Sequence, residues 1–443
     1  MALSRREFLS TTAAGVTASG LASPALRAQG SSTLNFAFAP DESGAIAGLI
    51  EDFNRTNEQG VEVRWIEAPE NSDDFFRFLV SDFQAGASDL DLFGSDVIWT
   101  AELAANGWIR DVSRSAFGEI DTGALLPAAL NSGYWRNRLW AVPWYTDAGM
   151  LFYRRDLLEE AGISGPPGTW DDLAGAARTV MDSAGTEHGF VFQGARYEGG
   201  VTNALEFIWS AGGRTWTGTS EVSGAFGMAG PESNVIVLNS RDSVLGLSKA
   251  RDLVENGVAP EAVTGFNERD ALRVFAAGDA VFMRNWPFAY GLLGSEEFGP
   301  VTPDQVGVAK IPTLRPGATS YSCLGGWNLA ISANSTRSPA AWAFIRHALQ
   351  TDQQRAMART GGYLPVLADL YGDEALREAV PVVALGEEAV QSARARPGST
   401  IYSQLSPRIS LMFRRVLSGE IPAEEAVERT TRELRTIVSN SRY

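Results

Sequence analysis

The sequence predicts an α/β protein of two domains, each built on a mainly parallel sheet flanked by helices. The chain has 443 residues, which is longer than one hydrophobic core usually organises. Segments with alternating apolar residues, typical of strands, take turns with segments whose apolar residues recur every three or four positions, typical of helices. This order is typical of parallel sheets with helices on both faces. A third observation is an apolar segment at 142–159, suited to cross between the domains.

The first domain begins with three pairs of a strand and a helix. Apolar residues alternate in 34–38, as on a half-buried strand, and those of 46–53 share one face of a helix. The predicted elements are strands 34–38, 61–65 and 90–93 and helices 46–53, 73–83 (with Asp73 as N-cap) and 97–106. In such sheets ligands bind beyond the carboxyl ends of the strands. Asp41, Glu42 and Asp96 follow these ends and are candidate binding residues, although Asp96 is equally suited to cap the next helix.

The segment at 142–159 is the first predicted crossing, because Pro and Gly bound a run that is typical of a strand buried on both faces. A hairpin at 134–140 leads into it. The second domain then has a helix capped by Thr169, strands 189–194, 280–283 and 306–312, helices 201–211, 242–256 and 268–277, and a Gly/Ser/Thr-rich excursion at 212–238. A second crossing follows at 324–331 and a third near 396–399. The remaining predicted helices are 338–350, 352–359, 373–395, 402–417 and 422–438.

The N-terminus predicts export. Arg5 and Arg6 form a twin-arginine pattern, which a weakly apolar run and small residues near Ala28 follow, as in a cleaved signal peptide. Residues 1–28 hold three Arg and one Glu, so cleavage changes the formal net charge from −16 to −18. Such a charge argues against nucleic acid and anionic membrane surfaces as partners.

Cysteine and histidine are scarce. Cys323 is the single cysteine, which excludes a disulfide framework and leaves no cysteine near the signal for a lipid anchor. With only His188 and His347 and no metal-binding motif, a zinc site is not expected. These observations predict a soluble periplasmic protein without a metal or cofactor.

Aromatic residues recur beside a carboxylate or an arginine at predicted strand ends. Tyr145 and Asp147 lie at the first crossing, Trp286 follows Arg284 after a strand, Trp327 lies at the second crossing, and Arg396 at the third. Sugars need this combination, because their C–H faces pack on aromatic rings and their hydroxyls bond to charged groups. Arg284 is expected to be structural, and a single Trp is more often a core residue than a ligand platform.

Seven stretches together resemble the substrate-binding proteins of ABC sugar importers, above all the trehalose/maltose-binding branch. They cover nearly all of 34–438 and are SDVIWTAELAANGWI, AVPWYTDAGMLFYRRDLLEEAG, GFVFQGARYEG, FMRNWPFAY, LGGWNLAIS, GGYLP and ARPGSTIYSQLS. The resemblance implies a monomeric two-lobed periplasmic binding protein fold with hinge strands, and membrane permease subunits as partners. After the signal at 1–28, the implied lobes are 29–146 with 327–395, and 147–326 with 396–443. The implied carbohydrate ligands are Glu42, Asp96, Tyr145, Asp147, Trp286, Gly326, Trp327 and Arg396.

One position departs from this branch. Its members carry an arginine that points at the sugar near the start of the second helix, and by spacing from Asp96 that position is Phe75. If the ring faces the cleft, it would change which sugar is preferred. If it packs inside the lobe, Arg77 or Asn71 would supply the polar contact. The resemblance thus favours an α-linked disaccharide but does not choose trehalose or maltose.

Two other functions remain open. A secreted carbohydrate-active hydrolase needs two carboxylates at a defined separation, which 53 acidic residues neither establish nor exclude. The same fold could instead bind a polyamine or glycerol phosphate, since aromatic rings with carboxylates hold cationic amines. No GxSxG nucleophile motif, phosphate loop or dinucleotide fingerprint is present.

Overall fold

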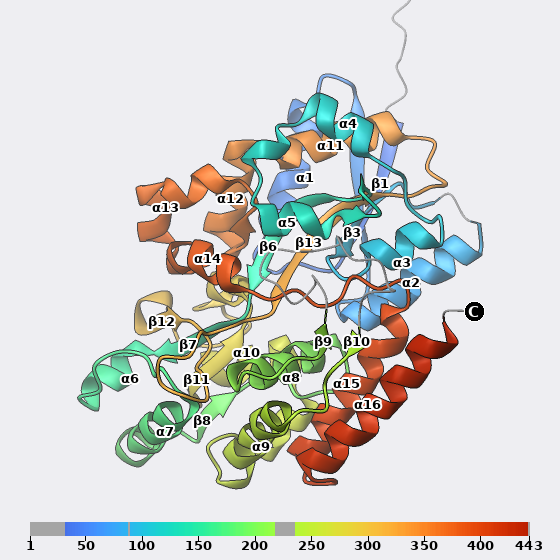
Figure 1. The fold of residues 1–443 in the computed structure, drawn as a ribbon. Coiled ribbons are helices and arrows are strands. Elements are labelled where there is room, and N and C mark those ends of the chain that lie inside the picture. The colour runs from blue at the N-terminus through green and yellow to red at the C-terminus, as the bar shows by residue number, and fades with distance from the viewer. Residues whose placement is uncertain (1–31, 87–88, 218–234, 442–443) are drawn as a thin grey trace, which may run out of the picture.

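Two sheets organise the computed structural model, which describes residues 32–86, 89–217 and 235–441 (Figure 1). The first has six strands in the order β14-β6-β13-β3-β1-β2, and the second has four in the order β12-β7-β11-β8. We call the parts built on them the first and the second lobe. The division at 146, 326 and 395 stays a prediction, and the predicted signal peptide lies outside the described residues.

The first lobe begins with the expected alternation. Strand β1 (Ser32–Phe38) pairs in parallel with β2 (Val61–Glu67) and β3 (Leu92–Asp96). Helices α1 (Ala45–Thr56), α2 (Ser72–Gln84) and α3 (Thr100–Ala105) connect or follow them.

Two predicted helix starts in this part are wrong. The N-cap of α2 is Asn71 and not Asp73, because the Asn71 side chain accepts the N–H of Asp73 at 2.9 Å. Helix α3 begins at Thr100 rather than at 97, after a turn in which Asp96 accepts the N–H of Ile98 at 3.2 Å.

Both sheets are mixed, which corrects the expectation that each is mainly parallel. Strand β6 (Val142–Ala148) continues through Gly149 into β7 (Met150–Arg154), and β13 (Leu324–Ile331) returns to the first lobe. Strand β13 is antiparallel to β3 and β6, and β7 is antiparallel to β11 (Ala280–Asn285) and β12 (Val306–Ala309). A strand that enters a lobe from the other one must run away from the boundary, whereas the parallel strands end there. The crossings themselves therefore impose the antiparallel pairs.

The other elements complete the two lobes. The first lobe also has β4 (Tyr134–Trp135), β5 (Arg138–Leu139), β14 (Leu364–Pro365), α4 (Ser113–Glu119), α5 (Pro127–Ser132), α11 (Ser338–Ala348), α12 (Thr351–Gly361), α13 (Glu374–Ala379) and α14 (Pro381–Ser392). The second lobe has β8 (His188–Val191), β9 (Trp216–Thr217), β10 (Val235–Ile236), α6 (Arg155–Glu160), α7 (Trp170–Ala184), α8 (Glu198–Ser210), α9 (Arg241–Glu255), α10 (Glu268–Ala276), α15 (Tyr402–Leu417) and α16 (Ala423–Asn440). Short 3-10 helices are η1 (Thr122–Ala124), η4 (Glu261–Gly265), η5 (Pro287–Leu292), η6 (Pro303–Gln305) and η7 (Ala368–Gly372).

Two local predictions, a helix cap and a hairpin, are confirmed, and a third, a single helix at 373–395, is corrected. Thr169 caps α7 in a capping box with Asp172. The hairpin of β4 and β5 turns at Arg136 and Asn137, both with positive φ (49° and 60°). The region predicted as one helix at 373–395 is two helices, α13 and α14, because Pro381 starts the second. Most of the predicted excursion, 218–234, lies outside the described residues.

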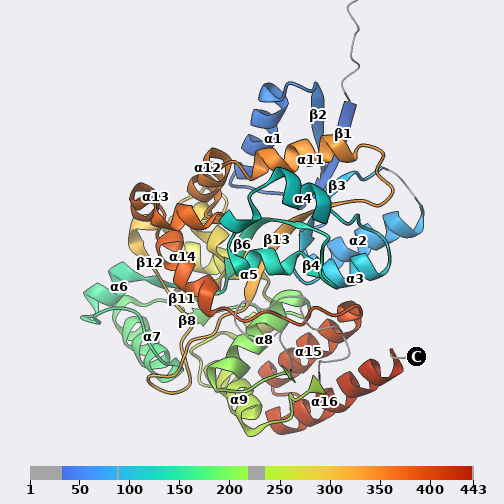
Figure 2. The same ribbon diagram turned by 45° about the horizontal axis from the view of Figure 1, so that its top comes forward.

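The buried residues form two clusters, one around each sheet. The cluster of the first sheet extends into the second lobe through α10, where Leu272 and Phe275 are fully buried. The chain between α14 and α15 passes from the first lobe to the second (Figures 1 and 2). Three chain segments thus meet at the boundary, which places their side chains around one cleft.

Candidate functional site

A cleft of about 240 Å³ lies between the lobes, where the parallel strands end. All eight residues that the resemblance selects line it: Glu42, Asp96, Tyr145, Asp147, Trp286, Gly326, Trp327 and Arg396. The resemblance therefore selects residues that are up to 354 positions apart in the sequence and that the fold brings to one cleft. Whether each of them binds a ligand stays a prediction.

Asp147 is the least satisfied polar group of the cleft. Its side chain lies at the end of β6, its residue is 7% exposed, and its Oδ1 has no hydrogen-bond partner among the described residues. Burial, followed by repulsion from Asp96, raises its pKa well above the ordinary range. Gly325 lies opposite it on β13, and a Cβ there would come within 3.1 Å of the Asp147 Cβ. A buried oxygen without a hydrogen bond destabilises the protein, and a ligand that donates a hydrogen bond to Asp147 would remove this destabilisation.

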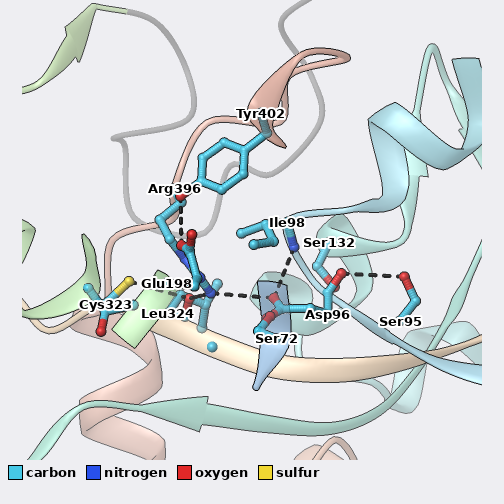
Figure 3. A network of polar contacts seen from close by, with 12 residues as sticks. Ser72, Ser95, Asp96, Ile98, Ser132, Glu198, Cys323, Leu324, Arg396 and Tyr402 are labelled. Atoms are coloured by element: carbon cyan, nitrogen blue, oxygen red, sulfur yellow. Dashed lines mark hydrogen bonds and ion pairs between the residues drawn. The ribbon is translucent and has the colours of Figure 1, made fainter. Parts of the chain in front are cut away.

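A network of charged groups joins the lobes on one side of the cleft (Figure 3). Arg396 donates from Nη1 to Glu198 Oε1 at 2.6 Å and from Nη2 to the Leu324 carbonyl at 3.3 Å, and its Nη2 lies 3.6 Å from Asp96 Oδ1. Ser72 donates to Asp96 Oδ2 at 2.9 Å. Burial raises the pKa of both Asp96 and Glu198, and the Arg396 guanidinium opposes that rise. Two carboxylates of the protein itself, those of Glu198 and Asp96, therefore already neutralise the charge of Arg396.

Trp327 presents a half-buried indole to the cleft. Phe75 stacks on it, with ring centroids 5.6 Å apart and 23° between the planes. Phe38 and Trp99 pack against it edge to face, with ring centroids 5.0 and 5.3 Å from its own and interplanar angles of 87° and 90°. Three rings thus hold the indole in one orientation.

This arrangement shows which way Phe75 points. It is fully buried and does not line the cleft, so it packs inside the lobe behind Trp327. Of the two alternative polar residues, Asn71 lines the cleft, whereas Arg77 is 68% exposed and pairs with Asp74. An arginine at 75 would place a charge in the core of this protein.

We expect Phe75→Leu to weaken sugar binding about threefold, because an aromatic pair adds roughly 0.5–1.5 kcal/mol beyond burial and the Trp327 ring would lose its support. Calorimetry with maltose measures the change. Phe53→Leu is the matched control, since Phe53 is equally buried but lies on α1 away from the cleft. It should lower the melting temperature similarly and leave affinity unchanged. Equal affinities of the two variants would contradict the supporting role.

Trp286 rests on a buried ion pair. The guanidinium carbon of Arg284 lies 4.0 Å from the Trp286 ring centroid. Arg284 donates from Nε and Nη2 to the two oxygens of Glu206, both at 2.7 Å, and the Cys323 N–H also donates to Glu206, at 2.9 Å. A Cβ at Gly149 would come within 2.0 Å of Glu206 Oε1, so the glycine between β6 and β7 makes room for this pair. Arg284 is structural, as predicted.

Arg269, at the start of α10 in the second lobe, reaches the first lobe. It forms ion pairs with Glu42 and Glu70 there, and lies 3.4 Å from Glu297 in its own lobe. Glu42, predicted only as a sugar ligand, is thus also a contact between the lobes.

Sequence reasoning did not single out several lining residues, which are Glu70, Tyr197, Glu198, Glu268, Arg269 and Tyr363. Most lie near the start of a helix, where the strand-end pattern does not mark them. Tyr197 and Glu198 belong to the quoted GFVFQGARYEG stretch and could have been found. So could Tyr363, which belongs to the quoted GGYLP stretch. Its hydroxyl donates to Asp41 Oδ1 at 3.1 Å.

The donors of the cleft are largely bound to its own carboxylates. Seven carboxylates and two arginines line it. Both arginines pair with carboxylates, Tyr363 donates to Asp41, and the Tyr197 hydroxyl and Trp286 Nε1 (at 3.2 Å) donate to Glu268. Of the buried groups without a partner, Asp147 Oδ1 can accept a hydrogen bond and Arg396 Nε can donate one. Within the described part of the chain, no group of three His, Cys, Asp or Glu is placed to hold a metal ion.

The family model described as bacterial extracellular solute-binding protein matches residues 39–355. The chain is 33% identical over 366 residues to a probable ABC transporter-binding protein of Deinococcus radiodurans, a match that covers 81% of this chain and 82% of the relative.

Solved structures agree with this match. The structure of maltose-bound MalE3 of T. maritima has a TM-score of 0.83 and 34% identity, covering 92% of this chain and all of that one. A solute-binding protein of Thermotoga lettingae bound with α-D-tagatose has a TM-score of 0.79 at 23% identity, covering 92% and 100%, and shows the fold alone.

Proposed function

The chain belongs to the family of bacterial extracellular solute-binding proteins, and on that basis we propose that it is the periplasmic substrate-binding component of an ABC sugar importer. It binds an oligosaccharide between the lobes and delivers it to membrane permease subunits, without catalysis. An α-linked disaccharide such as maltose or trehalose is the proposed ligand. The 34% identical structure holds maltose, and the cleft of this chain is lined by Trp286 and Trp327 together with seven carboxylates.

The observation that carries this proposal is the excess of acceptors beside aromatic rings. A sugar can donate a hydrogen bond from each hydroxyl, and such a bond contributes roughly 0.5–1.5 kcal/mol to a neutral acceptor and about 1.5–3 kcal/mol to a charged one. Asp147 has an unpaired oxygen for one of them. A phosphate needs positive charge, and Arg269 and Arg396 each already form ion pairs with carboxylates of the protein. This balance favours a sugar over glycerol phosphate.

Calorimetry with maltose, trehalose, sucrose, tagatose, spermidine and glycerol 3-phosphate tests the proposal. We expect micromolar binding of at least one α-linked disaccharide, about −8 kcal/mol, and none of glycerol phosphate. Binding of spermidine alone would assign the cleft to an amine. Hydrolysis of a bound disaccharide, followed by chromatography and lost in Asp147→Ala, would support the hydrolase instead.

Export is part of the same proposal. Arg5 and Arg6 lie in the predicted signal peptide at 1–28, outside the described residues. In the described ranges, no helix has the length and apolar character needed to cross a membrane. The twin-arginine route and a monomeric state stay predictions.

A further inference from the structure

Glu102 reaches from the first lobe to the second. It lies on α3, its residue is 9% exposed, and both of its carboxylate oxygens bond to Ser403 near the start of α15. Oε2 accepts the Ser403 N–H at 3.0 Å, and Oε1 accepts the Ser403 hydroxyl at 2.6 Å. The two residues are 301 positions apart, and α15 packs against α8, α9 and α16 of the second lobe.

The start of α15 has no side-chain cap from its own N-cap residue. Its N-cap residue, Ile401, makes no side-chain hydrogen bond to the helix, although the helix has 16 residues. Such an end leaves N–H groups unpaired and carries a partial positive charge, and a carboxylate stabilises both. Glu102 supplies that carboxylate from the opposite lobe. Burial raises the pKa of Glu102, and the two Ser403 bonds oppose the rise, so the contact stabilises the charge.

The same turn of α15 holds the charged network of the cleft. Tyr402 donates to Glu198 Oε1 at 2.7 Å, and Ser406 donates to Glu198 Oε2. Glu198 in turn binds Arg396, which lies beside Asp96 of the first lobe (Figure 3). Glu102 and Asp96 are six positions apart on the first lobe, and both connect to this one turn.

We propose that Glu102 is a positioning residue for ligand binding, because it caps α15 across the lobes and so favours the closed arrangement that holds Arg396 in the cleft. Glu102 does not line the cleft, so it acts without touching the ligand. This inference rests on the proposed function, because both require that ligand binding closes the two lobes.

The test compares Glu102→Ala, Glu102→Gln and Ser403→Ala with wild type, using maltose. Loss of a helix cap destabilises the arrangement that the cap holds, so we expect affinity for maltose to fall about fivefold in Glu102→Ala, with faster dissociation in stopped flow. Glu102→Gln should recover part of it, since an amide oxygen still accepts one hydrogen bond. In Ser403→Ala the N–H bond survives, and the loss should be smaller than in Glu102→Ala.

Glu388→Ala is the matched control. Glu388 on α14 pairs across the lobes with Lys310, the residue after β12, at 2.5 Å, but its side chain is 65% exposed. An exposed pair contributes little, so affinity should be unchanged. A purely structural role would give a different result. Glu102→Ala would then lower the melting temperature equally with and without maltose, and its affinity and dissociation rate would equal those of Glu388→Ala. That outcome would show the inference to be wrong.

Small-angle scattering separates this inference from the proposed function. The contact needs no ligand, so ligand-free Glu102→Ala should have a larger radius of gyration than ligand-free wild type. If wild type binds no sugar of the panel, the proposed function fails, and the radii still decide the role of Glu102. If wild type and Glu102→Ala have equal radii of gyration and equal sugar affinities, the proposed role of Glu102 is wrong.

Discussion

Trp327→Ala should weaken maltose binding by at least about tenfold, or roughly 1.4 kcal/mol. One side of the indole is supported by Phe75, so the side that lines the cleft is a preformed surface for the C–H face of a sugar. A rigid platform loses little entropy on binding, and its removal leaves the sugar face without contact. Calorimetry measures the loss.

Trp135→Ala controls for the general effect of removing a tryptophan. Trp135 is half-buried in the hairpin of β4 and β5 and does not line the cleft. Its loss should change stability but not affinity. If the two variants bind maltose equally well, Trp327 is not a sugar platform.

Glu206→Gln should lower the free energy of unfolding by about 3–5 kcal/mol, because it leaves the Arg284 charge buried without its partner. The two side chains are only 2% and 1% exposed. The change also weakens the acceptor of the Cys323 N–H and the support beneath Trp286. Urea denaturation followed by circular dichroism gives the free energy.

The double variant Glu206→Gln with Arg284→Met distinguishes an unpaired charge from a packing defect. Removal of both charges should recover much of the stability, since an apolar replacement of a buried pair is often neutral. A double variant no more stable than Glu206→Gln would show that shape, rather than charge, causes the loss.

The sequence was sufficient for the positions of the site residues but not for their partners. Strand ends and crossings can be read from local patterns, and they bring Asp96, Tyr145 and Trp327 to one cleft. Glu198 and Arg269 come from helix starts in the other lobe, and nothing in their neighbouring residues reveals which carboxylate or guanidinium they meet. Such contacts depend on how the lobes are placed.

Two errors have identifiable causes, one local and one not. Asn71 and Asp73 are both good N-caps, so the capping residue could not be chosen from the sequence. Phe75 lies among several Phe residues of α2, and only its packing behind Trp327 shows where its ring points. The mixed sheets follow from the return of β13, whose direction no local pattern encodes.

Cys323 gives this protein a practical property. It is the single cysteine of the chain, it is fully buried, and burial raises its pKa to about 12. Thiol reagents attack thiolates at accessible positions, so we expect the native, folded chain to be unreactive toward maleimide dyes. A cysteine introduced at the rim of the cleft, for example in place of Glu70, whose side chain is 44% exposed, would be the one labelled site. An environment-sensitive dye there would report the approach of the lobes, which turns the protein into an optical sensor for its own ligand.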